Sequence, residues 1–181
     1  MAVQQNQLIL TPNGAKIFRD TETLAKAFQT KTPLLGRIMG GLRGDVFRFD
    51  FEGQTFVLKE YLTDTVDGIT ESGLGQAGAY NLIKNVISEQ QWIRGFTSEK
   101  GYKIQLKAPE IFAFSNAQLV MEKMGRIKEA KFLEPGEERE AFEELRDNLA
   151  GLGFEVISKA ELWLESFDAG KKTASFVLLD P

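Results

Sequence analysis

The segment "VFRFDFEGQTFVLKEYL", residues 46–62, decides the predicted fold because it has the pattern of two strands joined by a tight turn. Aromatic residues alternate with charged ones along the first strand, at Phe47, Phe49 and Phe51. That period of two is typical of a strand with one buried face. Residues 52–54 supply the turn, and residues 55–62 form the returning strand. This second strand carries Lys59 inside an apolar run, where an ammonium group is costly unless it is paired or bound.

The composition of the 181-residue chain is that of a globular protein, with 43% hydrophobic and 27% charged residues. A chain of this length forms one domain or two very small lobes. The formal net charge is -4. That balance argues against a surface for polyanions, so we expect no nucleic-acid partner.

The chain contains neither cysteine nor histidine. This excludes disulfides, zinc sites built from thiolates or imidazoles, cysteine nucleophiles and triads that use histidine. Acid–base chemistry would have to use Asp, Glu, Lys or Tyr side chains. The first residues show no signal-peptide pattern, and no apolar run reaches the ~18 residues of a membrane span. We therefore expect a cytoplasmic protein without membrane contact.

The remaining segments add helices and strands in an irregular order. Residues 7–19 predict a hairpin that turns at Pro12-Asn13-Gly14, and residues 63–75 predict a loop. The other predicted elements are a helix over 20–30 capped by Asp20 or Thr21, a helix over 76–96, strands over 104–124 turning at Ser115-Asn116, a helix over 134–154, and a hairpin over 161–181 turning at 168–170. This order predicts the α+β class rather than a regular βαβ alternation.

A glycine-rich stretch precedes the first of the two strands. The sequence "GGLRGDV", residues 40–46, contains Gly41 and Gly44 ahead of Val46. Glycines let backbone N–H groups approach phosphate oxygens closely. The alternative is an ordinary flexible turn between two strands.

Lys59 has two interpretations. The spacing between Val46 and Lys59 fits a strand, a tight turn and a returning strand, so both side chains can face the same side. Lys59 could then neutralise a phosphate bound beneath the glycine turn. Alternatively, Lys59 lies on an edge strand and extends its ammonium group into solvent.

Two further acidic positions follow apolar strand segments. "QLVMEKMG", residues 118–125, runs through Glu122 into a glycine, and "FVLLDP" places Asp180 at the end of the last strand. The carboxylate of Asp180, at the end of a buried strand, suits a divalent cation. The alternative for either position is simply a strand that leaves the core.

The order and spacing of these features resemble the protein-kinase-like fold. Gly41, Gly44 and Val46 match the family's glycine-rich hairpin, G-x-G-x-x-G-x-V, although Met39 stands where its first glycine would be. Residues 56–59, Phe-Val-Leu-Lys, resemble the strand that carries the family's lysine.

The resemblance extends to the second half of the chain. The segment "AQLVMEKMG" resembles the hinge strand, with Glu122 to Met124 where an adenine would meet backbone groups, and Asp180 resembles the metal-binding aspartate. It implies ATP and Mg²⁺ as ligands, with Gly41, Gly44, Val46, Lys59, Glu122 and Met124 around the nucleotide and Asp180 on the metal. It also implies a two-lobed arrangement: an N-terminal hairpin and helix over 1–33, an N-lobe over 34–124 with an antiparallel sheet and one inserted helix, and a reduced C-lobe over 125–181 with a helix and a hairpin.

The sequence departs from the family where catalysis would take place. The helix after Lys59 should carry a glutamate that pairs with the lysine, but residues 76–86 contain no acid. The catalytic loop should lie within residues 153–166, which contain no His, Asp or Asn. Ser158 and Trp163 stand near the positions of the base and the second metal ligand, and neither can perform those roles. Nearby glutamates, among them Glu165, are candidate substitutes or simply surface charges.

We therefore expect a minimal, catalytically degenerate kinase-like domain with no catalytic residues. Such a domain would act as a binding or regulatory module with a protein partner, holding a nucleotide or no cofactor at all. One alternative is a small active phosphotransferase that uses Lys59 and Asp180. Another is an α+β interaction scaffold unrelated to kinases.

Overall fold

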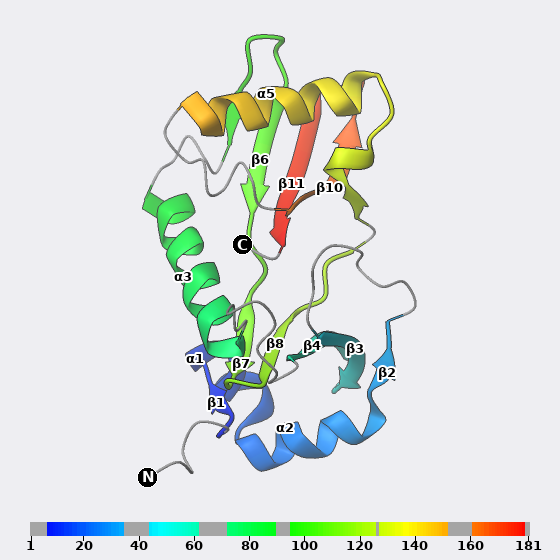
Figure 1. Ribbon diagram of the computed structural model, residues 1–181. Coiled ribbons are helices and arrows are strands. Elements are labelled where there is room, and N and C mark those ends of the chain that lie inside the picture. The colour runs from blue at the N-terminus through cyan, green and yellow to red at the C-terminus, as the bar shows by residue number, and fades with distance from the viewer. Residues whose placement is uncertain are drawn as a thin grey trace. The chain divides into compact units, whose positions relative to one another are not determined.

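The computed structural model describes residues 7–34, 44–61, 72–89, 95–125, 127–151 and 161–179 (Figure 1). The chain forms two compact units, each assembled from two separate stretches of sequence. Unit 1 comprises Met1–Ala79 and Glu110–Lys123, and unit 2 comprises Tyr80–Pro109 and Met124–Pro181. Each unit contains one sheet together with helical segments, which confirms the predicted α+β class.

The sheet of unit 1 has six strands in the order β1-β7-β8-β4-β3-β2, and every neighbouring pair is antiparallel. The strands are β1 (Ile9–Leu10), β2 (Thr32–Pro33), β3 (Gly44–Phe51), β4 (Gln54–Tyr61), β7 (Ile111–Phe114) and β8 (Gln118–Glu122). β4 lies inside the sheet, between β8 and β3, whereas the two-residue strands β1 and β2 form its edges.

The predicted hairpin of β3 and β4 is confirmed. Glu52 and Gly53 make the turn, and both have positive φ angles, 48° and 79°. The larger angle belongs to Gly53, because a glycine adopts it without strain. The register places Phe47 opposite Leu58 and Phe49 opposite Phe56. These four apolar side chains therefore share one face of the sheet.

An aromatic core covers that face of unit 1. The ring of Phe18 is central to it, with ring centroids 5.0 Å from Phe56, 5.1 Å from Phe51, 6.2 Å from Phe49 and 6.4 Å from Phe112. The cover consists of α1 (Pro12–Phe18), α2 (Thr21–Ala27) and the short 3-10 turn η1 (Phe28–Thr30). Leu24 and Ala27 of α2 are buried in the same cluster, so the helix predicted over 20–30 is confirmed with Asp20 as its N-cap.

The hairpin predicted around Pro12-Asn13-Gly14 is wrong, because these residues open the helix α1. The Thr11 hydroxyl accepts a hydrogen bond from the Gly14 amide at 3.1 Å and donates one to the Ile111 carbonyl at 2.8 Å. Pro12 occupies the first turn, where its missing N–H costs nothing. A threonine N-cap followed by proline is a helix start, and this signal outweighs the turn tendency of Pro-Asn-Gly.

The predicted amphipathic helix after the β3–β4 hairpin is confirmed as α3 (Gly73–Glu89). It begins within the segment predicted as loop, because Ser72 caps it: the Ser72 hydroxyl accepts from the Gly75 amide at 3.1 Å. The Gly73 amide donates to the Asn116 carbonyl at 3.0 Å. The first turn of α3 is thus attached to the β7–β8 turn of unit 1.

The sheet of unit 2 has five strands in the order β5-β6-β11-β10-β9. They are β5 (Phe96–Thr97), β6 (Lys103–Lys107), β9 (Lys128–Glu129), β10 (Glu161–Asp168) and β11 (Thr173–Leu179), and a 3-10 turn, η2 (Ala130–Phe132), follows β9. The predicted hairpin of β10 and β11 is confirmed. β6 pairs with β11 in parallel, which makes this sheet mixed.

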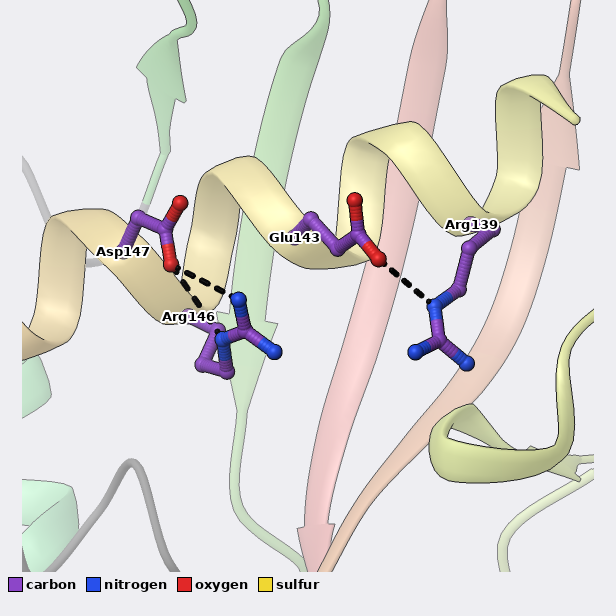
Figure 2. A network of polar contacts seen from close by, with 4 residues as sticks. All are labelled: Arg139, Glu143, Arg146 and Asp147. Carbon is purple, nitrogen blue, oxygen red and sulfur yellow. Dashed lines mark hydrogen bonds and ion pairs between the residues drawn. The ribbon is translucent and has the colours of Figure 1, made fainter. Parts of the chain in front are cut away.

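Helix α5 (Glu137–Gly151) confirms the helix predicted over 134–154 and lies across the sheet of unit 2 (Figure 1). Its buried residues are Ala141, Phe142, Leu145 and Leu149. They pack in one cluster with Leu106 of β6 and Phe176 of β11. Its polar side carries two partly exposed ion pairs, Arg139–Glu143 at 2.9 Å and Arg146–Asp147 at 3.0 Å (Figure 2).

The boundaries of the two units do not coincide with the predicted segments 1–33, 34–124 and 125–181. β1, α1, α2 and β2 belong to unit 1 together with the β3–β4 hairpin, and β5 and β6 are hydrogen-bonded into unit 2. The chain passes from unit 1 to unit 2 between Lys123 and Met124, inside the predicted hinge strand. Among the described segments, no helix combines the length and the apolar character needed to cross a membrane.

Candidate functional site

Lys59 lies in the interior of the unit 1 sheet. It is only 4% exposed, and its directly opposite residues are Val46 on β3 and Leu119 on β8. The prediction that Val46 and Lys59 share a face is confirmed by this register. The alternative, an edge lysine that reaches solvent, is wrong because β4 is not an edge strand and the side chain is buried.

The face that carries Lys59 is opposite to the aromatic core. Lys59 alternates with Leu58 and Glu60, so it points away from the cover of α1 and α2. Its same-face neighbours Leu119 and Tyr61 are also buried. These buried neighbours keep water away from the Lys59 ammonium group, so its charge is weakly screened on this face.

The glycine-rich stretch is described only in part. Gly44 is the first residue of β3 and is paired with Tyr61, two positions beyond the Val46–Lys59 pair. Gly41 lies outside the described residues. The contact of this stretch with phosphate therefore stays a prediction.

Glu122 and Met124 lie at and just beyond the end of β8. The Glu122 amide donates to the Glu110 carbonyl at 2.8 Å, and the Glu122 Oε2 accepts from the Glu110 amide at 3.2 Å. Glu122 is exposed and belongs to unit 1, whereas Met124 is half-buried and belongs to unit 2. The amide and one carboxylate oxygen of Glu122 are thus engaged within its own unit.

The predicted metal ligand Asp180 lies outside the described residues, as does Ser158. Trp163 is a half-buried residue of β10. Across the described segments, no group of three or more Asp or Glu residues is arranged to hold a metal ion. The relation between Lys59 and Asp180 therefore stays a prediction.

Glu165, a candidate substitute base, is held in a polar cluster of unit 2. Its Oε2 accepts from Lys107 Nζ at 2.7 Å and from Ser175 Oγ at 2.8 Å. Burial alone would raise the pKa of Glu165, but the hydrogen bonds from Lys107 and Ser175 bring it below its ordinary value. A carboxylate stabilised in this way is a weak base, so its contacts favour a structural role.

A β-bulge directs Glu165 into this cluster. The register passes from Leu164 opposite Phe176 directly to Ser166 opposite Ser175, so Glu165 is the extra residue of β10. Nothing in the alternation of the sequence predicts the bulge, because it depends on the pairing with β11.

A second cluster, also missed by the sequence analysis, surrounds Glu60 on the opposite face from Lys59. Lys31 Nζ lies 2.6 Å from Glu60 Oε2, and Gln118 Nε2 donates to Glu60 Oε1 at 3.1 Å. The Lys31 ammonium also lies 4.2 Å from the centre of the Phe47 ring. Residues 31 and 60 are far apart in sequence, so only the tertiary structure brings them together.

Two sequence comparisons with known proteins find no match. No model of a known protein family matches the chain, and no curated protein matches its sequence significantly. The resemblance to the protein-kinase-like fold is therefore an interpretation that rests on the residues quoted above.

Proposed function

We propose that this chain is a catalytically degenerate, kinase-like binding module that holds the phosphates of a nucleotide on the Lys59 face of unit 1. Lys59 supplies the positive charge, Val46 forms the apolar wall beside it, and the stretch from Gly41 to Gly44 supplies backbone N–H groups. ATP with Mg²⁺ is the proposed ligand.

The burial of Lys59 in an interior strand is the observation that carries this proposal. Lys59 is 4% exposed and lies between Val46 and Leu119, so water screens the charge of its ammonium group only weakly. That charge therefore attracts a phosphate more strongly than the charge of an exposed strand lysine would.

Binding without turnover is proposed because the residues expected for transfer are missing from the sequence. Residues 153–166 contain no aspartate, asparagine or histidine. The nearest described carboxylate in that range, Glu165, already accepts hydrogen bonds from Lys107 and Ser175. A protein partner would then bind the nucleotide-bound state of the module in preference to the free state.

Thermal unfolding with and without ATP and Mg²⁺ tests the proposal. A ligand that binds only the folded state stabilises it by about 2.7 kcal/mol at a concentration of 100 Kd. For a chain of this size that corresponds to a rise in Tm of about 5–10 °C. We expect this rise for the wild type, with no phosphate transfer above background in a radiolabel assay.

The matched variants are Lys59→Met and Lys103→Met. Both remove one strand lysine, but Lys103 is exposed on β6 of unit 2. We expect Lys59→Met to abolish the shift and Lys103→Met to keep it, while urea unfolding without ligand reports whether each variant folds. An unchanged wild-type Tm at millimolar ATP would reject nucleotide binding and leave the interaction scaffold. Measurable turnover would instead favour the active phosphotransferase.

A further inference from the structure

The N-terminal segment of unit 1 is joined to the strand of Lys59 by one partly buried ion pair. Lys31 directly precedes β2, and its Nζ lies 2.6 Å from Glu60 Oε2. The two side chains are 29% and 31% exposed, whereas the Lys26–Glu22 pair on α2 is 68% and 79% exposed. Solvent screens the Lys31–Glu60 pair less, so its charge interaction is the stronger of the two.

The position of Glu60 makes this pair important for the proposed site. Glu60 follows Lys59 in β4, and its directly opposite residue on β3 is Asp45. Like charges directly opposite each other in a sheet are destabilising. Asp45 and Glu60 lie between the Gly44–Tyr61 pair and the Val46–Lys59 pair, so their repulsion acts at the end of the hairpin that carries the proposed ligand-binding residues.

Lys31 is placed to offset that repulsion. Its ammonium group pairs with Glu60 and also lies over the ring of Phe47, a β3 residue paired with Pro33 of β2. Gln118 of β8 donates to the other oxygen of Glu60 at 3.1 Å. Contacts of Lys31 and Glu60 thus connect β2, β3, β4 and β8 at this end of the sheet.

We propose that Lys31 is a positioning residue, which holds the ends of β3 and β4 together by neutralising Glu60 opposite Asp45. It thereby sets the affinity of the Lys59 face for a polyphosphate. This inference rests on the proposed function for its effect on affinity. The coupling of the strand ends is independent of any ligand. Residues 7–33 then contribute, through Lys31, to the ligand affinity of unit 1.

Two measurements on the full chain test the inference. The first is amide hydrogen exchange of residues 44–47 and 58–61 without ligand, in the wild type, Lys31→Met and Lys26→Met. The second is calorimetric titration of the same proteins with Mg²⁺–ATP and with inorganic tripolyphosphate. Lys26→Met is the matched control, because it breaks an ion pair of similar length, 2.8 Å, in the same segment.

We expect Lys31→Met to speed exchange at these strand ends and to weaken both ligands by roughly two- to fivefold, the range for one cross-strand charge contact. Lys26→Met should change neither quantity. In an Asp45→Asn background the repulsion is already gone, so adding Lys31→Met should change affinity by less than about 1.5-fold. A general loss of packing would not be rescued in this way.

The outcomes separate the two proposals. If the wild type binds and Lys31→Met binds equally well, the positioning role is rejected. The same holds if Lys31→Met weakens binding as much with Asn at position 45 as with Asp. If the wild type binds neither ATP nor tripolyphosphate, the proposed function fails, and the exchange rates alone decide whether Lys31 holds the two strand ends together.

Discussion

At the scale of single residues, Gly73 and Gly78 of α3 show how differently one residue type is used. A Cβ atom on Gly73 would overlap the carbonyl oxygens of Ser115 and Gln118, whereas a Cβ on Gly78 would have no neighbour within 4 Å. Gly73 is therefore required by close backbone packing in unit 1. Gly78 only adds conformational entropy to the unfolded chain.

We predict opposite effects of alanine at these two glycines. Gly73→Ala should lower the free energy of unfolding by at least about 2 kcal/mol, because backbone atoms cannot move aside as a flexible side chain would. Gly78→Ala should raise it by about 0.5–1 kcal/mol through helix propensity. Urea unfolding of both variants measures the difference. Equal stabilities would mean that α3 does not begin against the β7–β8 turn.

Lys59 and Glu165 illustrate what a residue's surroundings decide. Both stand in strands where the sequence leaves open whether the charge is exposed. Lys59 is buried because β4 is an interior strand, and Glu165 reaches Lys107 and Ser175 because of a bulge. Neither fact follows from the residues next to them in sequence.

At the scale of elements, α5 combines a buried apolar side with an exposed charged side. Its first turn contains three glutamates, which suits the positive end of the helix dipole. Leu145 is 1% exposed in the core of unit 2, and its neighbour Arg146 is ion-paired to Asp147 (Figure 2). Packing of the apolar side, rather than the ion pairs, should supply most of the stability of α5.

Alanine substitutions at these neighbouring positions of α5 test that statement. Leu145→Ala should destabilise the protein by about 2–5 kcal/mol, because it leaves a cavity under the helix. Arg146→Ala should cost less than about 0.5 kcal/mol, and added salt should make little difference to the wild type. Chemical unfolding at two salt concentrations measures both. If Arg146→Ala lowered the free energy of unfolding by several kcal/mol, the ion pairs rather than the apolar packing would supply most of the stability of α5.

At the scale of the whole molecule, the two units are interleaved along the chain. β6 and β7 are separated by only three residues, yet β6 pairs with β11 in unit 2 and β7 pairs with β1 and β8 in unit 1. Each unit has its own core, with Phe56 in the first and Phe176 in the second. A substitution in one core should therefore loosen strands that are distant in sequence.

We predict that Phe176→Leu will accelerate amide exchange in β6 more than in β7. Phe56→Leu should do the reverse, because Phe56 lies in the core of unit 1. Each change removes part of a buried ring and should cost about 1–2 kcal/mol, small enough to keep the chain folded. Peptide-resolved hydrogen exchange on the intact protein distinguishes the two strands. Equal acceleration of β6 and β7 by both variants would mean that the cores do not unfold separately.

Much of the local structure could be predicted from the residues alone. The Glu52-Gly53 turn, the Ser115-Asn116 turn, the acidic start of α5 and the α+β class all depend on short-range signals. The error at residues 12–14 arose from two local signals in conflict, a threonine cap and a Pro-Asn-Gly turn. The cap prevailed because Thr11 also donates to Ile111, a contact with a strand about a hundred positions away.

The candidate site was predictable only in its outline. Alternation placed Val46 and Lys59 on one face, and the register confirms this. The Lys31–Glu60 contact and the bulge at Glu165 were not predictable. Both depend on how strands pair in the folded chain, and no periodic pattern in the sequence indicates that pairing.

By itself, the sequence determined the turn at Glu52-Gly53, the starts of α2 and α5, and the side of each strand that is apolar, because these follow from backbone preferences and from a period of two or 3.6 residues. Only the tertiary structure decided which strands are neighbours: that β4 lies inside its sheet and buries Lys59, and that β6 joins β11 in parallel. Pairing between distant strands depends on the burial available in the whole fold, and no short stretch of residues contains that information.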